Sequence, residues 1–151
     1  MALQVPKPKG LGFTCYFWFF QREMLTLMGA ETAPTLYLVQ LAVELLGELN
    51  TPAMQAAWQH VLDRHPALRA IPVTHYGLLL QAVCNQVALP WLHQDLTHME
   101  APQQQAQVAR LLGRDRQRGF RPIAAPLPRV SIIQTGAARQ LLVFTSHHFR
   151  E

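Results

Sequence analysis

Glycine and proline breaks divide this chain into short segments, and this division constrains the fold more than any other feature of the sequence. The breaks fall at residues 29–34, 47–52, 101–102, 119–128 and 135–138. No internal repeat or low-complexity tract interrupts this pattern. The segments between the breaks have the patterns of helices and strands in alternation, which predicts an α/β fold.

Two of these segments are predicted to be helices. One begins at Thr51, a suitable N-cap followed by Pro52, and ends before Pro66. Its apolar residues recur at helical spacing at Met54, Ala57, Trp58, Val61 and Leu62. The other covers residues 102–118, where helix-forming residues lead to a cationic last turn before Gly119.

The remaining segments are predicted to be mainly extended. Residues 36–46 form an apolar run that is typical of a strand covered on both faces, so we expect it to be central. Residues 130–134 and 140–146 are expected to form a hairpin. Extended segments are also predicted over 70–73 and 78–83, and a short helix over 21–28.

The N-terminal segment, residues 1–20, contains an apolar run behind Lys7 and Lys9. A bilayer span takes about 20 apolar residues, whereas this run meets Gln21 after ten. No clear small-residue cleavage site follows, although residues 28–30 are a weak candidate. The pattern favours a segment packed on the lobe formed by residues 21–151 over a signal peptide.

Charge and cysteine content narrow the range of partners. The formal net charge is +4, and the cations are scattered except for Arg110, Arg114, Arg116 and Arg118 on the second helix. Their spacing is typical of a solvated helix end, with contact to an acidic carrier domain as the alternative. No nucleic-acid or membrane partner is expected. Cys15 and Cys84 form no CxxC pair, which favours reduced thiols and a cytoplasmic protein.

Other residues that could form a site are better explained by structural roles. Five scattered histidines lack the spacing of metal ligands, so no metal site is expected; they are His60, His65, His75, His93 and His98. Three tryptophans are expected to lie in the core, namely Trp18, Trp58 and Trp91.

His147 and His148 are the strongest candidates for chemistry. They follow the apolar strand at residues 140–146, and a polar tip after a buried strand is where such sheets present reactive groups. Adjacent strand residues point to opposite faces, so one imidazole can face a cleft while the other packs inward. Taken alone, the dipeptide favours two surface or structural histidines over a catalytic pair.

Four stretches, in this order along the chain, resemble the condensation domains of nonribosomal peptide synthetases. They are residues 21–25 (QREML), 64–69 (RHPALR), 119–129 (GFRPIAAPLPR) and 146–151 (SHHFRE). The last is similar to the start of the family's His-His-x-x-x-Asp-Gly signature. The resemblance implies one lobe of a chloramphenicol acetyltransferase-like fold, a two-layer sandwich with a mixed sheet.

The resemblance also implies an acyltransferase that forms amide bonds. Its donor and acceptor are carried as thioesters on the phosphopantetheine arms of carrier proteins, and no cofactor is bound directly. His148 matches the catalytic histidine, as a base or an amine-positioning residue, and His147 is a supporting residue. Arg69 matches the arginine that pairs with the aspartate of the signature.

The chain ends at Glu151, the fifth position of that signature. We therefore expect the Asp-Gly pair and a C-terminal lobe to be missing, and this segment alone to be inactive. We also expect the free lobe to expose an apolar inter-lobe face and to self-associate. Two rival functions remain open: a same-fold O-acyltransferase of the wax-ester or polyketide-associated type, and a non-catalytic module that docks carrier proteins.

Overall fold

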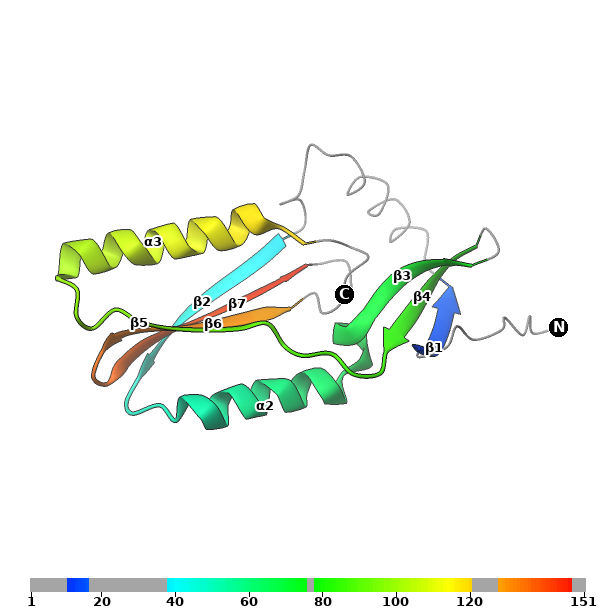
Figure 1. Ribbon diagram of the computed structural model, residues 1–151, viewed down its shortest axis with the longest axis horizontal. Helices are drawn as coiled ribbons and strands as arrows, with labels where there is room; N and C mark the ends of the chain where they lie inside the picture. The colour runs from blue at the N-terminus through cyan, green and yellow to red at the C-terminus, as the bar shows by residue number, and fades with distance from the viewer. Residues whose placement is uncertain (1–10, 17–37, 76–77, 121–127, 148–151) are drawn as a thin grey trace.

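The computed structural model describes residues 11–16, 38–75, 78–120 and 128–147 of the chain (Figure 1). The elements in order are β1 (Leu11–Tyr16), β2 (Leu38–Leu46), α2 (Thr51–Arg64), the 3-10 helix η1 (Pro66–Arg69), β3 (Ala70–His75), β4 (Leu78–Cys84), β5 (Trp91–Asp95), α3 (Ala101–Arg118), β6 (Arg129–Gly136) and β7 (Arg139–His147).

The described strands form two sheets. A four-stranded sheet has the order β2-β7-β6-β5, in which β5 runs parallel to β6 and the other pairs are antiparallel. A three-stranded antiparallel sheet has the order β1-β4-β3, so residues 11–16 of the apolar N-terminal segment pair through their main chain with β4. The expected α/β fold with a mixed sheet is confirmed.

A helix covers each face of the four-stranded sheet, whereas the resemblance implied a two-layer sandwich. Val130 of β6 and Phe144 of β7 belong to the core on the α2 side, together with Leu62. Ile133 lies three positions after Val130, and Val143 lies one position before Phe144. Both belong to the core on the α3 side. Because successive strand residues point to opposite faces, α2 and α3 lie on opposite sides of the sheet (Figure 1).

The two predicted helices are confirmed, with one correction at the start of α2. The N-cap is Asn50 rather than Thr51, because the Asn50 side chain accepts a 3.0 Å hydrogen bond from the Ala53 amide. Thr51 is the first residue of the helix, with Pro52 directly after it. None of the helices in the described ranges is both long and apolar enough to cross a membrane.

The strand predicted over 36–46 is confirmed as β2, but its expected central position is wrong. Among the described strands β2 pairs with β7 alone and forms the edge of its sheet. Val39, Leu41 and Val43 are 47%, 54% and 39% exposed. Their partners in register lie on the α2 face, but the core beneath α2 is built on the other three strands. The apolar run reflects a row of side chains that α2 does not cover.

Strand β5 was not predicted. Its five residues carry three polar side chains, and only two of the five are even partly buried. Pairing with β6 holds this segment as a strand, in register from Trp91 opposite Val130 to Asp95 opposite Gln134. The predicted β6–β7 hairpin is confirmed.

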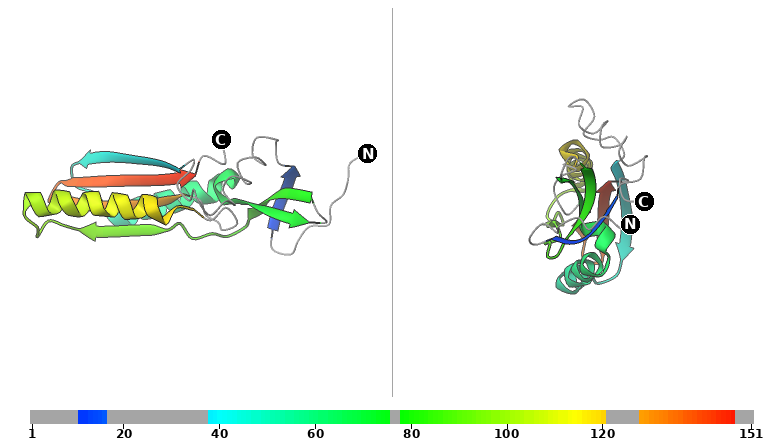
Figure 2. Two further views of the ribbon diagram at one scale, coloured as in Figure 1. Left: turned by 90° about the horizontal axis from the view of Figure 1, so that it is seen from above. Right: turned by 90° about the vertical axis from the view of Figure 1, so that its right-hand side faces the viewer.

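The three-stranded sheet lies beyond one end of the four-stranded sheet (Figures 1 and 2). Helix α3 and strand β7 end at this same side, and strands β2 and β6 begin there (Figure 1). The last residue of β7 therefore lies where several element ends meet.

Candidate active site at the end of strand β7

His147 is the last residue of β7 and packs inward. It is 2% exposed, and its register partner on β2 is Leu38. Its imidazole meets the ring of Phe120 edge to face, with 6.2 Å between ring centroids and an angle of 82° between the planes. His148, the predicted catalytic residue, is next in sequence but lies outside the described residues.

Phe120 contacts both His147 and a cation. The guanidinium carbon of Arg129 lies 4.1 Å from the centre of the Phe120 ring, within the range of a cation–π interaction. Arg129 also donates a 2.7 Å hydrogen bond from Nη1 to the carbonyl of Gly119, which ends α3 with a φ of 57°. Arg129 thereby holds the turn that places Phe120 beside His147.

Asp115, in the last turns of α3, accepts hydrogen bonds from three other elements. Arg129 of β6 forms an ion pair with Oδ1 and also binds the Asp115 carbonyl. Thr145 of β7 donates to Oδ2 at 2.5 Å, and Gln40 of β2 donates to the same oxygen at 2.8 Å. The Asp115 side chain is 18% exposed and that of Arg129 is 8% exposed. The interaction is thus a largely buried, charge-assisted network.

This network lowers the pKa of Asp115. Burial acts in the opposite direction and would raise the pKa, because it disfavours the charged carboxylate. The hydrogen bonds from Thr145, Arg129 and Gln40, with the positive charge of Arg129, outweigh it and hold the pKa below the ordinary value of 3.8. Asp115 is therefore ionised at neutral pH.

This network was not predicted from the sequence. Arg129 belongs to one of the stretches that resemble the family, but no role was expected for it. Asp115 lies among the arginines of α3, which were interpreted as a solvated helix end. The bonds join residues 14, 30 and 75 positions apart, and no local pattern shows such pairings. The only signal was a single acid in an otherwise cationic helix end.

Arg69 is buried, at 9% exposed, and lies in η1 directly after α2. Within the described residues its side chain bonds only main-chain carbonyls: those of Leu62, Asp63, Cys84 and Asn85. These bonds use four of the five guanidinium hydrogens and leave one on Nη2. Arg69 thus holds the end of α2 against the end of β4. In Figure 1, η1 and the end of β7 lie at the same end of the four-stranded sheet.

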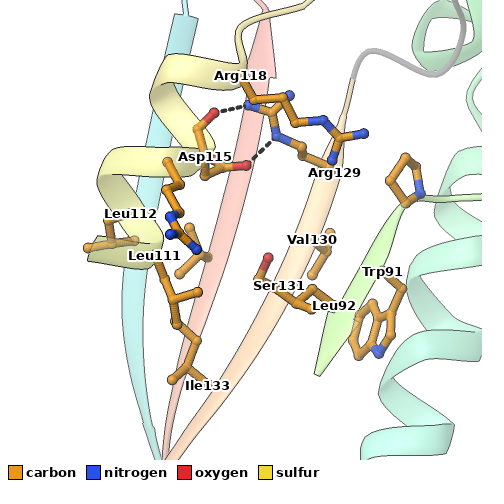
Figure 3. A pocket seen from close by; sticks show the side chains of 13 residues that line it. Trp91, Leu92, Leu111, Leu112, Asp115, Arg118, Arg129, Val130, Ser131 and Ile133 are labelled. Atoms are coloured by element: carbon orange, nitrogen blue, oxygen red, sulfur yellow. Dashed lines mark hydrogen bonds and ion pairs between the residues drawn. The ribbon is translucent and has the colours of Figure 1, made fainter. Parts of the chain in front are cut away.

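A groove of about 310 Å³ lies between α3 and strands β5 and β6. Its apolar lining includes Leu92, Leu111 and Ile133. Figure 3 shows the Asp115–Arg129 pair at one end of this groove, with Arg118 beside it. The Asp115–Arg129 pair therefore contributes to the groove wall and also leads, through Phe120, to His147.

A metal centre has no support in the described part of the chain. No three of its histidine, cysteine and acidic side chains are grouped so that they could hold a metal ion.

Comparison with known proteins identifies the family. The profile described as "Condensation domain" matches residues 14–149. The chain is 31% identical over 116 residues to one of the linear gramicidin synthase proteins of Brevibacillus parabrevis, and 35% identical over 130 residues to another. These matches cover 74% and 85% of the chain and 2% of each synthase protein.

A solved structure shows the same fold. The starter condensation domain of rhizomide synthetase superposes with a TM-score of 0.80 at 20% identity. The match covers 91% of this chain and 33% of that structure. The chain therefore spans a small part of its curated relatives and a third of that solved domain. Since the family profile covers nearly all of the sequence, the chain belongs to the condensation-domain family.

Proposed function

We propose that the domain to which this chain contributes forms an amide bond between two carrier-bound substrates. The donor is an acyl or peptidyl thioester, and the acceptor is the amine of an aminoacyl thioester. The observation that carries the proposal is the family match over residues 14–149, which includes His147, the last residue of β7, and His148, the next residue in the sequence. A buried His147 supports it, because a fixed strand end gives the next residue a defined starting point.

In the proposed reaction the acceptor amine attacks the donor carbonyl carbon. The carbon–nitrogen bond forms, the carbon–sulfur bond breaks, and the phosphopantetheine thiol leaves. An α-amino group has a pKa of about 8 and an imidazole of about 6.5, so a neutral histidine can accept or orient the proton that the amine loses. His148 would have this role. The phosphopantetheine arms belong to partner carrier proteins, and this chain binds no cofactor itself.

His147 and Arg69 would support this site without touching substrate. His147 packs on Phe120, and Arg69 holds α2 against β4. Among the described residues, one guanidinium hydrogen of Arg69 is not used by a main-chain carbonyl, and it suits a single bond to the aspartate of the family's signature.

The second lobe is the proposed partner of the exposed apolar face of β2, formed by Val39, Leu41 and Val43. Without that lobe, we propose that two copies of this chain associate through the same face, and that the single lobe is inactive. An apolar row on an edge strand favours such pairing.

The test is an assay of the domain completed by its second lobe, with two loaded carrier proteins and mass spectrometry of the product. His148→Ala should lower the rate roughly 100- to 10,000-fold, the usual effect of removing an acid–base group. His98→Ala, an exposed histidine in the turn before α3, is the matched control and should leave the rate unchanged. Equal rates for both variants would refute the role of His148.

The same assay separates the rival functions. Faster transfer to an alcohol acceptor than to an amine would favour an O-acyltransferase. Carrier binding without any product, in the completed domain, would favour a docking module. Product formed by the 151-residue chain alone would contradict the proposed need for a second lobe.

We also propose a cytoplasmic location. Cys84 is a free thiol, which suits a reducing compartment. Thiol labelling of intact cells with a membrane-permeant reagent should modify the protein, whereas an impermeant reagent should not.

A further inference from the structure

We propose that Asp115 is a positioning residue that sets the orientation of the His147 ring at the end of β7. Its relevance to catalysis rests on the proposed function, but the geometry that supports it does not. Two routes of contacts lead from the Asp115 carboxylate on α3 to His147 on β7.

The first route runs through β7 itself. Thr145 is fully buried and donates its hydroxyl to Asp115 Oδ2 at 2.5 Å. Thr145 and His147 are two positions apart, so their side chains lie on the same face of the strand, the face toward α3. Asp115 thereby fixes β7 at Thr145, two residues before the histidine.

The second route runs through β6 and the end of α3. The Arg129 guanidinium donates to the carboxylate and the carbonyl of Asp115. The same guanidinium lies over the face of Phe120, and the Phe120 ring meets His147 at 82°. The carboxylate holds Arg129 in a place where it fixes the aromatic ring that packs against the imidazole.

The negative charge of Asp115 is essential to this arrangement. Its carboxylate accepts from Arg129, Thr145 and Gln40 together, and Gln40 lies two positions after Leu38, the register partner of His147. An amide in the same place has one acceptor oxygen, and its NH2 group faces either Arg129 or both Thr145 and Gln40, all of which donate to the carboxylate. Asp115→Asn should therefore loosen both routes at once.

The test measures the His147 ring in the folded 151-residue chain by its carbon–proton NMR signals at neutral pH. The signal is assigned with His147→Gln. In Asp115→Asn we expect the His147 signals to move or broaden, since the ring loses its fixed place beside Phe120. Thr145→Val should produce a smaller change of the same kind, and Asp115→Glu should restore part of the original signal.

Gln104→Ala is the matched control. Gln104 lies on the same helix but at its other end, where its side chain donates to the carbonyls of Leu96 and Thr135 at 3.0 and 2.9 Å. Its loss should lower stability and leave the His147 signals unchanged. A merely structural role for Asp115 predicts the same behaviour for Asp115→Asn as for this control, and that result would overturn the proposal.

Two arrangements keep the test decisive. If Asp115→Asn does not fold, Thr145→Val and Arg129→Lys test the two routes separately, and unmoved His147 signals in both variants would overturn the proposal. The NMR result does not depend on activity. A moved signal with an unaffected His148→Ala rate would refute the proposed function and leave the positioning role in place.

Discussion

The hydroxyl of Thr145 on β7 lies 2.5 Å from a carboxylate oxygen of Asp115 on α3, although the two residues are 30 positions apart in the chain. This bond joins the helix to the strand that ends in His147. A hydrogen bond to a charged acceptor contributes about twice as much as one between neutral groups. The contact therefore helps to determine both the stability of the lobe and the position of its candidate site.

Thr145→Val should lower the free energy of unfolding by about 2 kcal/mol, because it removes a hydrogen bond to a charged group while keeping the shape of the side chain. Urea denaturation measures the change. Thr135→Val is the matched control, since the Thr135 hydroxyl makes only a 3.3 Å bond in the exposed hairpin. Equal losses for the two variants would contradict a special role for the Thr145–Asp115 bond.

The stability that Asp115 contributes should depend on pH. Its pKa is lower in the folded chain than in the unfolded one, so its contribution is complete above the unfolded pKa of about 3.9 and is lost as pH falls toward the folded value. The difference in stability between the original chain and Asp115→Asn should be constant from about pH 5 to 7 and shrink below about pH 4. Urea titrations at each pH measure it, and a difference that grows on acidification would disprove the argument.

Replacement of the N-cap should distinguish Asn50 from Thr51. Asn50→Ala should lower the free energy of unfolding by about 1 kcal/mol, because the Ala53 amide loses its acceptor, whereas Asn50→Asp should retain most of the stability. Thr51→Ala is the control and should change little. The reverse order in thermal or urea denaturation would restore Thr51 as the cap.

Arg69→Lys should destabilise the lobe even though it keeps the positive charge. The guanidinium reaches four carbonyls in different directions, and one ammonium cannot match that geometry. The loss of these bonds, of which the one to Leu62 is buried and the others are partly buried, should lower the free energy of unfolding by about 3 kcal/mol. Arg64→Lys, at the exposed end of α2, should have little effect. A fully stable Arg69→Lys would show that these carbonyls find other donors.

Leu41→Lys should reduce self-association of the lobe. The Leu41 side chain is 54% exposed on the edge strand β2, and a charge there opposes apolar pairing. Sedimentation velocity over a range of concentrations measures the effect. Ala109→Lys on the exposed side of α3 adds the same charge elsewhere and should leave association unchanged. A chain that is monomeric before any substitution would refute the proposed association.

The sequence predicted those elements whose signals are local. The helix from residue 51 has regular apolar spacing and a cap region, and the hairpin has a short turn between two apolar runs. Strand β5 had no such signal, because pairing with β6 holds it rather than its own composition. The apolar run of β2 was misleading, since its sequence cannot show that α2 stops short of it.

The candidate site was predictable only in part. The His147-His148 pair comes at the end of an apolar run, and it is similar to the start of a family signature. Both signals are local, so the sequence alone made the pair a candidate. The Asp115–Arg129–Thr145 network depends on three elements meeting at one end of a sheet, and the arginine-rich helix gave the opposite impression of a solvated surface. A buried ion pair of this kind can be recognised only once the pairing of the strands and the packing of the helix on them are known.

The pairing of β2 with β7 has a consequence for synthesis of the protein. Strand β2 has no described partner other than β7, which leaves the ribosome about 90 residues later, after about 5 to 20 seconds at ordinary rates of elongation. During that interval the apolar segment of β2 is unpaired and can contact other nascent chains. The lobe should therefore depend on chaperones or slow growth for soluble yield, even when its final fold is stable.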